Sequence, residues 1–502
     1  MNLDWKICSR ARLARDARFD GKFFIGVLST KIYCRPICRA RTSKESNIRY
    51  FPTAAAAAEA GFRPCLRCRP ESSPGTPAWA GTQSTVSRAL RLISETGLED
   101  GGVETLAEHL GMSSRHLRRL FLRHLGATPN AVAQTRRLHF AKKLIDETAL
   151  PMMQVAFAAG FGCVRRFNAA IHKVYHRTPT QIRRLAHVAP PLSQDEYFFR
   201  LNFRPPYNWK CILEFLAARA TPGVEAVESA CYRRSISLNG RHGQIKVLLD
   251  EQNNAVIARV LFGDPCSLLF IIERIRAIFD LNADWAVIGK TLRADPGLER
   301  RMGADPGLRV PGCWNGFELA ACAILGQQAT VKEAATMAGR VASRFGQPLS
   351  GTNGLTHLFP TPETIADADV TCVGLPRERA ETLRTFARAV CSKQIRFDGA
   401  PDYDVFRAQL LEIPGIGAWT AQYVAMRALR DPDAFPGGDP GQYPCASDCL
   451  SPEFEHRTQA WRPWRAYAAM LLWQSSGSAK SRIEMHVRSR PYTALPLDSG
   501  PW

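Results

Sequence analysis

The sequence predicts a multidomain α+β protein, in which a small cysteine-rich module and an all-α domain precede an α+β domain and a second all-α domain. Three observations support this prediction. The chain has 502 residues, enough for about three to five domains. Two segments rich in Pro, Ser and Gly, residues 69–83 and 186–195, are typical of linkers. The pattern changes along the chain from paired cysteines to helical apolar spacing, then to short apolar strands, and finally back to helices.

Composition and charge narrow the class of protein. Hydrophobic residues make up 45% of the chain and charged residues 22%, so it can bury real cores and is not a disordered protein. Because no apolar run reaches about 18 residues and the N-terminus lacks an apolar signal segment, we expect a cytoplasmic protein without a membrane partner. The formal net charge is +20, and residues 1–187 carry +18 of it. Since Lys and Arg side chains release counterions when they bind phosphates, this predicts polyanion binding by the first third of the chain.

The first module, predicted over residues 1–74, contains two cysteine pairs. Cys34 and Cys38 are four residues apart, and Cys65 and Cys68 are three residues apart. Four thiolates at such spacings match a tetrahedral, all-cysteine Zn²⁺ site, and metal binding would help so small a module to fold. In a cytoplasmic protein the cysteines are expected to be thiols or metal ligands, not disulfides.

The stretch around these cysteines, FDGKFFIGVLSTKIYCRPICRARTSKESNIRYFPTAAAAAEAGFRPCLRCRP, resembles the N-terminal methyl-accepting domain of Ada proteins. The resemblance implies that Cys34 takes a methyl group from a methylphosphotriester in DNA and shares one zinc ion with the other three cysteines. A zinc-bound sulfur stays a thiolate, which is the nucleophilic form. Methylation would remove one negative charge and strengthen DNA binding. A purely structural zinc site is the alternative that the residues leave open.

The second module, predicted over residues 84–187, is helical. Residues 104–124 have the pattern of a helix-turn-helix with a break at Gly111, and a second copy turns at residues 160–162. Two copies joined by a linking helix resemble the AraC-type DNA-binding domain. The resemblance implies promoter DNA and RNA polymerase as partners and a location at the bacterial nucleoid. The side chains expected to face DNA are Ser114, Arg115, Arg118, Arg165 and Arg166.

The remaining chain is predicted to form an α+β domain over residues 194–308 and an all-α domain over residues 309–477, followed by an unassigned tail, residues 478–502. Short apolar segments with Gly or Asn turns between them indicate strands in the α+β domain, and helical spacing returns after it. The strands are expected at residues 197–203, 232–238, 243–250 and 255–262, and the helices between residues 312 and 473.

A helix-hairpin-helix is the strongest local motif of the second half, with Pro-Gly-Ile-Gly between two helical stretches. Gly415 and Gly417 let a DNA phosphate approach backbone N–H groups at a helix N-terminus. Asp439 follows about twenty residues later. Together with the segments FRPPYNWKCILEFLAARATPGVE, RVPGCWNGFELAACAILGQQ and AWRPWRAYAAMLLW, these residues resemble the AlkA type of 3-methyladenine-DNA glycosylase, over residues 196–475.

This resemblance implies excision of an alkylated purine that has left the base stack. Asp439 would stabilise the oxocarbenium-like sugar and guide the attacking water. A cationic base gains from stacking on aromatic faces, which favours alkylated purines over ordinary bases. The residues that match the family's pocket aromatics and its duplex wedge are Trp419, Tyr423, Trp473, Gln327 and Gln328.

Two absences narrow the expected reaction. Trp419 holds the position at which strand-cleaving relatives carry a lysine, so no Schiff base and no bifunctional lyase chemistry are expected. Cys445 and Cys449 are the last cysteines of the chain, so no C-terminal iron–sulfur cluster is expected.

Residues 440–456, PGQYPCASDCLSPEFEH, depart from the helical continuation that the family has after its aspartate. Their three prolines argue against a regular helix. The alternative function is therefore a DNA-binding transcription regulator, with structural zinc and a glycosylase half that binds DNA without catalysis.

Overall fold

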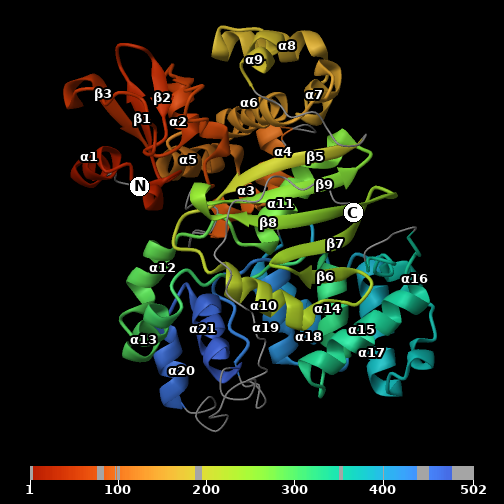
Figure 1. The fold of residues 1–502 in the computed structure, drawn as a ribbon. Coiled ribbons are helices and arrows are strands. Elements are labelled where there is room, and N and C mark those ends of the chain that lie inside the picture. Colours follow the sequence, from red (N-terminus) through yellow and green to blue (C-terminus); the bar gives the residue numbers. More distant parts are fainter. Residues whose placement is uncertain are drawn as a thin grey trace.

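The fold consists of a cysteine module and a helix-turn-helix domain above a five-stranded sheet, with a helical domain below it (Figure 1). We call these parts the cysteine module (residues 4–75), the double-HTH domain (84–186), the sheet domain (195–308) and the hairpin domain (309–477). The computed structural model describes residues 4–75, 84–96, 98, 102–186, 195–349, 354–399, 401–437 and 452–477.

The cysteine module contains a small four-stranded sheet of order β3-β1-β2-β4, which the sequence analysis did not predict. The pairing of β2 with β4 is parallel and sets Tyr33 opposite Pro64, so the chain after Cys34 runs beside Cys65. The elements are α1 (Trp5–Leu13), β1 (Phe24–Val27), β2 (Ile32–Cys34), β3 (Ile48–Phe51), α2 (Ala54–Glu59) and β4 (Arg63–Pro64).

The double-HTH domain has the predicted pair of helix-turn-helix motifs. Ser113 caps the second helix of the first motif, since its Oγ accepts a hydrogen bond from the His116 backbone N–H at 3.3 Å. In the second motif Cys163 takes the same place, and its Sγ accepts from the Arg166 N–H at 3.5 Å. The helices are α3 (Ser84–Thr96), α4 (Gly102–His109), α5 (Ser114–Leu125), α6 (Pro129–Glu147), α7 (Met152–Ala158), α8 (Val164–Tyr175) and α9 (Pro179–Leu185).

The sheet domain contains a wholly antiparallel sheet of order β5-β9-β8-β7-β6. The four predicted strands are confirmed as β5, β7, β8 and β9, and the short edge strand β6 was not predicted. The elements are β5 (Glu196–Asn202), α10 (Trp209–Arg219), β6 (Glu225–Glu228), β7 (Cys231–Leu238), β8 (Arg241–Asp250), β9 (Ala255–Phe262), α11 (Leu268–Ile278), α12 (Trp285–Leu292) and α13 (Pro296–Ala304).

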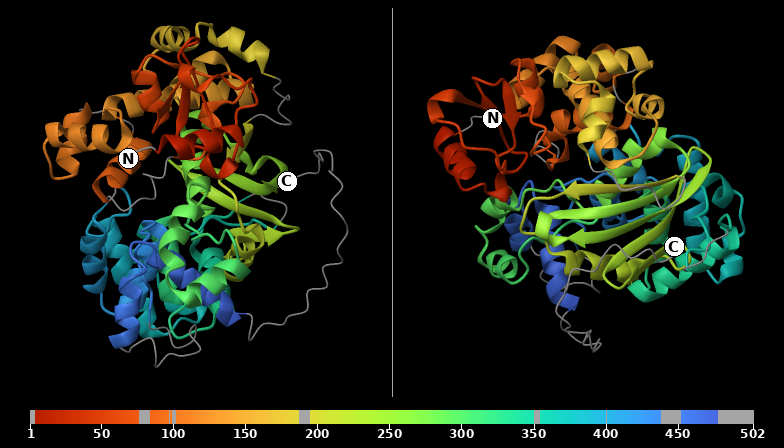
Figure 2. Two further views of the ribbon diagram at one scale, coloured as in Figure 1. Left: turned by 90° about the vertical axis from the view of Figure 1, so that its left-hand side faces the viewer. Right: turned by 45° about the horizontal axis from the view of Figure 1, so that its top comes forward.

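One hydrophobic cluster joins the double-HTH domain to the sheet domain. It contains Leu144 of α6 and Phe167 of α8 together with Phe199 of β5 and Val260 of β9, all fully buried. The right-hand view of Figure 2 shows these helices above the sheet. Because the cluster is continuous, the second helix-turn-helix is packed directly against the sheet domain.

The hairpin domain is helical, as predicted, and a second hydrophobic cluster fills it and takes in Phe215 of α10. No helix among the described residues is both long and apolar enough to cross a membrane. The helices are α14 (Gly316–Leu325), α15 (Val331–Phe345), α16 (Pro362–Ala366), α17 (Arg377–Cys391), α18 (Tyr403–Leu411), α19 (Ala418–Ala428), α20 (Pro452–Gln459) and α21 (Arg465–Gly477).

Candidate functional sites

The four predicted ligand cysteines form one cluster. The Sγ atoms of Cys34, Cys38, Cys65 and Cys68 all lie within 4.8 Å of one another. Parallel pairing of β2 with β4 brings the two pairs together, and the Cys65 N–H donates to the Tyr33 carbonyl at 3.0 Å. Four sulfur donors at this separation fit a tetrahedral Zn²⁺ site.

Arg35, the residue after Cys34, contacts the cysteine cluster through its backbone. The backbone N–H of Arg35 donates to Cys68 Sγ at 3.3 Å, and its buried guanidinium pairs with Asp20. Hydrogen bonds among the crowded thiols raise the pKa of Cys34 and lower that of Cys38 to about 7. Four sulfur atoms this close together form a donor set that a divalent cation would complete. Neither Arg35 nor Asp20 was predicted from the sequence.

The predicted DNA-facing arginines of the double-HTH domain are on the surface. Arg115 and Arg118 lie on the first turns of α5, and Arg165 and Arg166 lie on the first turn of α8, where Arg165 has the same position as Arg115; all four are exposed. Arg118 also pairs with Glu104 of α4 at 2.9 Å. Ser114, which was expected to face DNA, is half-buried at the first position of α5.

The helix-hairpin-helix connects α18 to α19 as predicted. Gly415 has φ = +88°, and a Cβ there would lie 2.2 Å from Thr382 Oγ1, so only glycine fits. Gly417 is the N-cap of α19, and no atom lies within 4 Å of the place where its Cβ would be. The Gln327 amide donates to the Gly415 carbonyl at 2.8 Å and so ties the predicted wedge loop to the hairpin.

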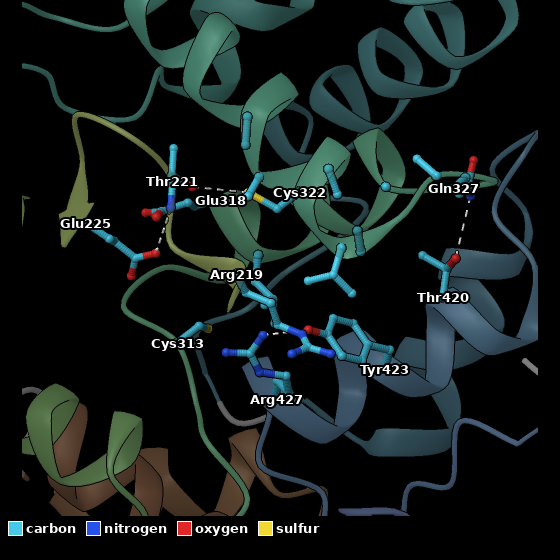
Figure 3. A pocket seen from close by; sticks show the side chains of 18 of the residues that line it. Arg219, Thr221, Glu225, Cys313, Glu318, Cys322, Gln327, Thr420, Tyr423 and Arg427 are labelled. Atoms are coloured by element: carbon cyan, nitrogen blue, oxygen red, sulfur yellow. Dashed lines mark hydrogen bonds between the residues drawn. The ribbon is translucent and has the colours of Figure 1, made fainter. Parts of the chain in front are cut away.

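A cavity of about 960 Å³ opens beside the hairpin (Figure 3). Trp419 and Tyr423 of α19 form one wall, their rings stacked with centroids 5.0 Å apart and an interplanar angle of 11°. Trp473 of α21 is buried, with its ring centroid 6.3 Å from that of Tyr423, and is not among the residues that line the cavity. Gln327 and Gln328 also line the cavity, and Gln328 has φ = +53°.

The polar part of the cavity lining comes from the sheet domain and α14. Arg219 ends α10, Arg234 lies on β7 and Glu318 lies on α14. Arg234 pairs with Glu318 at 2.8 Å, and burial raises the pKa of Glu318. None of these three residues was predicted from the sequence, although Arg219 and Glu318 stand in segments that carry the resemblance to AlkA-type glycosylases. Asp439, the predicted catalytic carboxylate, lies outside the described residues.

A four-thiol cluster, two helix-turn-helix motifs and a hairpin beside an aromatic cavity define a class of fused regulatory and DNA repair proteins. Four family models match this chain in the same order. They describe the metal binding domain of Ada (residues 7–71), a helix-turn-helix domain (106–185), the AlkA N-terminal domain (198–315) and the HhH-GPD superfamily of base excision DNA repair proteins (321–463).

The chain is 39% identical to a Mycobacterium tuberculosis protein named "Probable bifunctional transcriptional activator/DNA repair enzyme AlkA", over 94% of this chain and 97% of that protein. It therefore belongs to the family of fused Ada- and AlkA-type transcriptional activator and DNA repair proteins. Over 289 residues the chain is 32% identical to DNA-3-methyladenine glycosylase 2 of Escherichia coli, covering 56% of this chain and 98% of that one. The 3-methyladenine DNA-glycosylase structure from Archaeoglobus fulgidus matches at 22% identity and a TM-score of 0.49, covering 56% and 99% of the two chains.

Proposed function

We propose that this protein of the Ada- and AlkA-type family senses methylphosphotriesters in DNA, activates transcription, and hydrolyses the N-glycosidic bond of alkylated purines such as 3-methyladenine. The observation that carries the proposal is the stacked Trp419–Tyr423 wall, which faces a cavity of about 960 Å³ beside the hairpin. A flipped purine fits such a volume, and the faces of the indole and phenol rings attract a cationic base.

The glycosylase step would break the bond between C1′ of the sugar and the base nitrogen. The electron pair leaves with the base, and a water oxygen adds to C1′ while its proton passes to solvent or to the base. We assign to Asp439 the stabilisation of the oxocarbenium-like sugar and the orientation of that water. Trp419 has no amine, which supports a monofunctional reaction without strand cleavage.

The sensing step would form a bond between Cys34 Sγ and the methyl carbon and break the bond from that carbon to the phosphate oxygen. The phosphodiester leaves as an anion, and Cys34 becomes a thioether. Cys34, Cys38, Cys65 and Cys68 would hold one zinc ion, which when bound keeps the attacking sulfur a thiolate. Exposed arginines on α5 and α8 support a DNA partner for the double-HTH domain, and promoter DNA and RNA polymerase complete the proposed partners.

The glycosylase proposal is tested by release of free base from methylated DNA by the full chain. We expect 3-methyladenine release by the native protein and loss of it in Asp439→Asn. Absence of release above background by the native protein would favour the alternative, a DNA-binding regulator whose glycosylase half does not catalyse.

The sensing proposal is tested by transfer of a labelled methyl group from DNA to the protein. We expect the label on the native protein and none on Cys34→Ala. A native protein that binds zinc and acquires no label would show that the zinc site is structural only.

A further inference from the structure

The side chains of three arginines line the cavity, and two of them bond to several acceptors of the protein itself. Arg427 of α19 donates to the Tyr423 hydroxyl at 2.5 Å and to the Pro311 and Gly312 carbonyls at 2.9 Å each. It therefore holds the Tyr423 ring in its stacked position and has its charge satisfied by acceptors around it.

Arg234 is committed in a different way. It pairs with Glu225 at 3.0 Å and with Glu318 at 2.8 Å, and its Nε donates to the Ser235 carbonyl at 3.1 Å. A buried guanidinium between two carboxylates has few N–H donors left for a bound molecule. The role of Arg234 is therefore to join the sheet domain to α14.

Arg219 differs from both. Its guanidinium lies over the Phe215 ring, 3.9 Å from the centroid, and the Phe215 carbonyl accepts one long hydrogen bond from it at 3.5 Å. Its guanidinium also donates to the Tyr423 hydroxyl and lies near Arg427, and among the described residues it forms no ion pair with a carboxylate. Burial lowers the pKa of Arg219. Figure 3 shows the Arg219 and Arg427 side chains beside Tyr423 at the aromatic wall of the cavity.

A guanidinium offers five N–H donors and no acceptor. Guanine and hypoxanthine carry a carbonyl oxygen at position 6, which accepts hydrogen bonds, whereas adenine carries an amino group there, which donates. A donor beside that edge therefore favours the oxopurine. The positive charge of Arg219 also opposes the charge of a cationic base, so a neutral oxopurine gains most.

We propose that Arg219 is a specificity-determining residue that donates to the exocyclic oxygen of an oxopurine held against Trp419 and Tyr423. The assignment rests on the proposed glycosylase function and names the residue that would recognise an oxopurine in the same cavity. A charge-assisted hydrogen bond of this kind is worth about tenfold to a hundredfold in rate, because its energy is about 1.5–3 kcal/mol.

The test compares single-turnover release of hypoxanthine and of 3-methyladenine from otherwise identical duplexes, using the full chain. We expect Arg219→Met to slow hypoxanthine release about tenfold to a hundredfold and to change 3-methyladenine release less than about threefold. Arg219→Lys keeps one donor and should restore part of the hypoxanthine rate. Lys210→Met, an exposed change on the same helix, is the control and should match the native protein.

An equal fall for both substrates would show that Arg219 only supports the fold of the pocket, and no fall for either would remove it from base recognition; both results overturn the proposal. If the native chain releases neither base, the glycosylase function fails and the Arg219 assignment is tested by binding. Duplexes with uncleavable 2′-fluoro-2′-deoxyinosine or 2′-fluoro-2′-deoxyadenosine should then differ in affinity for the native chain. That difference should disappear in Arg219→Met, and its persistence would refute the assignment.

Discussion

Arg204 connects the cysteine module to the sheet domain, and replacing it tests how the cysteine module is held against the sheet domain. Its side chain is 1% exposed, although it lies in the loop that follows the end of β5. Its Nε donates to the Asp20 carbonyl at 2.8 Å, its Nη1 to the Asn282 carbonyl at 2.7 Å, and its Nη2 to the Gly75 carbonyl. One guanidinium thus satisfies three carbonyl oxygens from two parts of the chain.

Arg204→Met removes these donors and keeps the bulk of the side chain. Each buried carbonyl left without a partner costs about 1–3 kcal/mol. Burial lowers the pKa of Arg204 to about 10, so relief of that desolvation offsets part of the loss. The net effect is a weakening of the docked state by about 2–4 kcal/mol, or about thirtyfold to a thousandfold in the equilibrium between docked and undocked module.

Hydrogen–deuterium exchange of the amides in residues 18–24 measures this equilibrium, because exchange reports local opening without requiring global unfolding. Arg200→Met is the matched control, since Arg200 lies on β5 with a side chain 52% exposed and a surface ion pair to Asp250 at 3.3 Å. We expect the exchange rates to rise about thirtyfold or more in the Arg204 variant and less than threefold in the control. Equal rates in the two variants would refute the inference that Arg204 holds the module in place.

Three further predictions concern the hairpin, the contact between the cysteine module and α6, and the metal. Gly415→Ala should destabilise the hairpin domain by about 1–3 kcal/mol because its Cβ meets Thr382, whereas Gly417→Ala should fold normally and weaken DNA binding; equal thermal stability of the two variants would contradict this. Burial lowers the pKa of His139 from 6.5 to about 4, and its Nε2 lies 2.8 Å from the Tyr33 hydroxyl. The folded protein therefore holds the neutral ring, so stability is complete above pH 6.5 and is lost as the pH falls toward 4. Urea unfolding at pH 4.5 to 7.5 should show this slope in the native chain and a flatter one in His139→Gln. Chelation should remove one zinc per chain and lower the unfolding temperature of the cysteine module, and a metal-free chain with unchanged melting would contradict the site.

Local patterns predicted the longer elements. The strands β5, β7, β8 and β9 have seven to ten residues each and carry apolar residues next to turn residues, which is long enough for the pattern to be recognised. The sheet of the cysteine module was missed because its strands have two to four residues, too few to establish a period. Ser114 was expected to face DNA, but Ser113 is the N-cap of α5 and Ser114 is half-buried at the first helical position.

The candidate site residues also differ in whether a local pattern could predict them. The four cysteines and the aromatic pair Trp419 and Tyr423 follow from local spacing and from the resemblance, because each group lies within a short segment. Arg219 and Arg234 reach the cavity from α10 and β7, about two hundred residues before the aromatic wall. Their role depends on which partners saturate each guanidinium, and no spacing rule in a sequence contains that information.

The arrangement of the domains gives the uneven charge of the chain a physical meaning. Arg165 and Arg166 are exposed on α8 at the top of the molecule, while α19 and its hairpin lie at the bottom, with the sheet between them (Figures 1 and 2). The shared hydrophobic cluster of the double-HTH and sheet domains keeps these two faces apart. In the proposed function they would therefore hold separate stretches of DNA. Residues 1–187, with +18 of the net charge, would bind through salt-sensitive phosphate contacts, and the nearly neutral hairpin domain would bind through backbone amides and a shaped cavity. Raising the salt concentration would then release promoter DNA from residues 1–187 well before it releases a damaged duplex from the cavity.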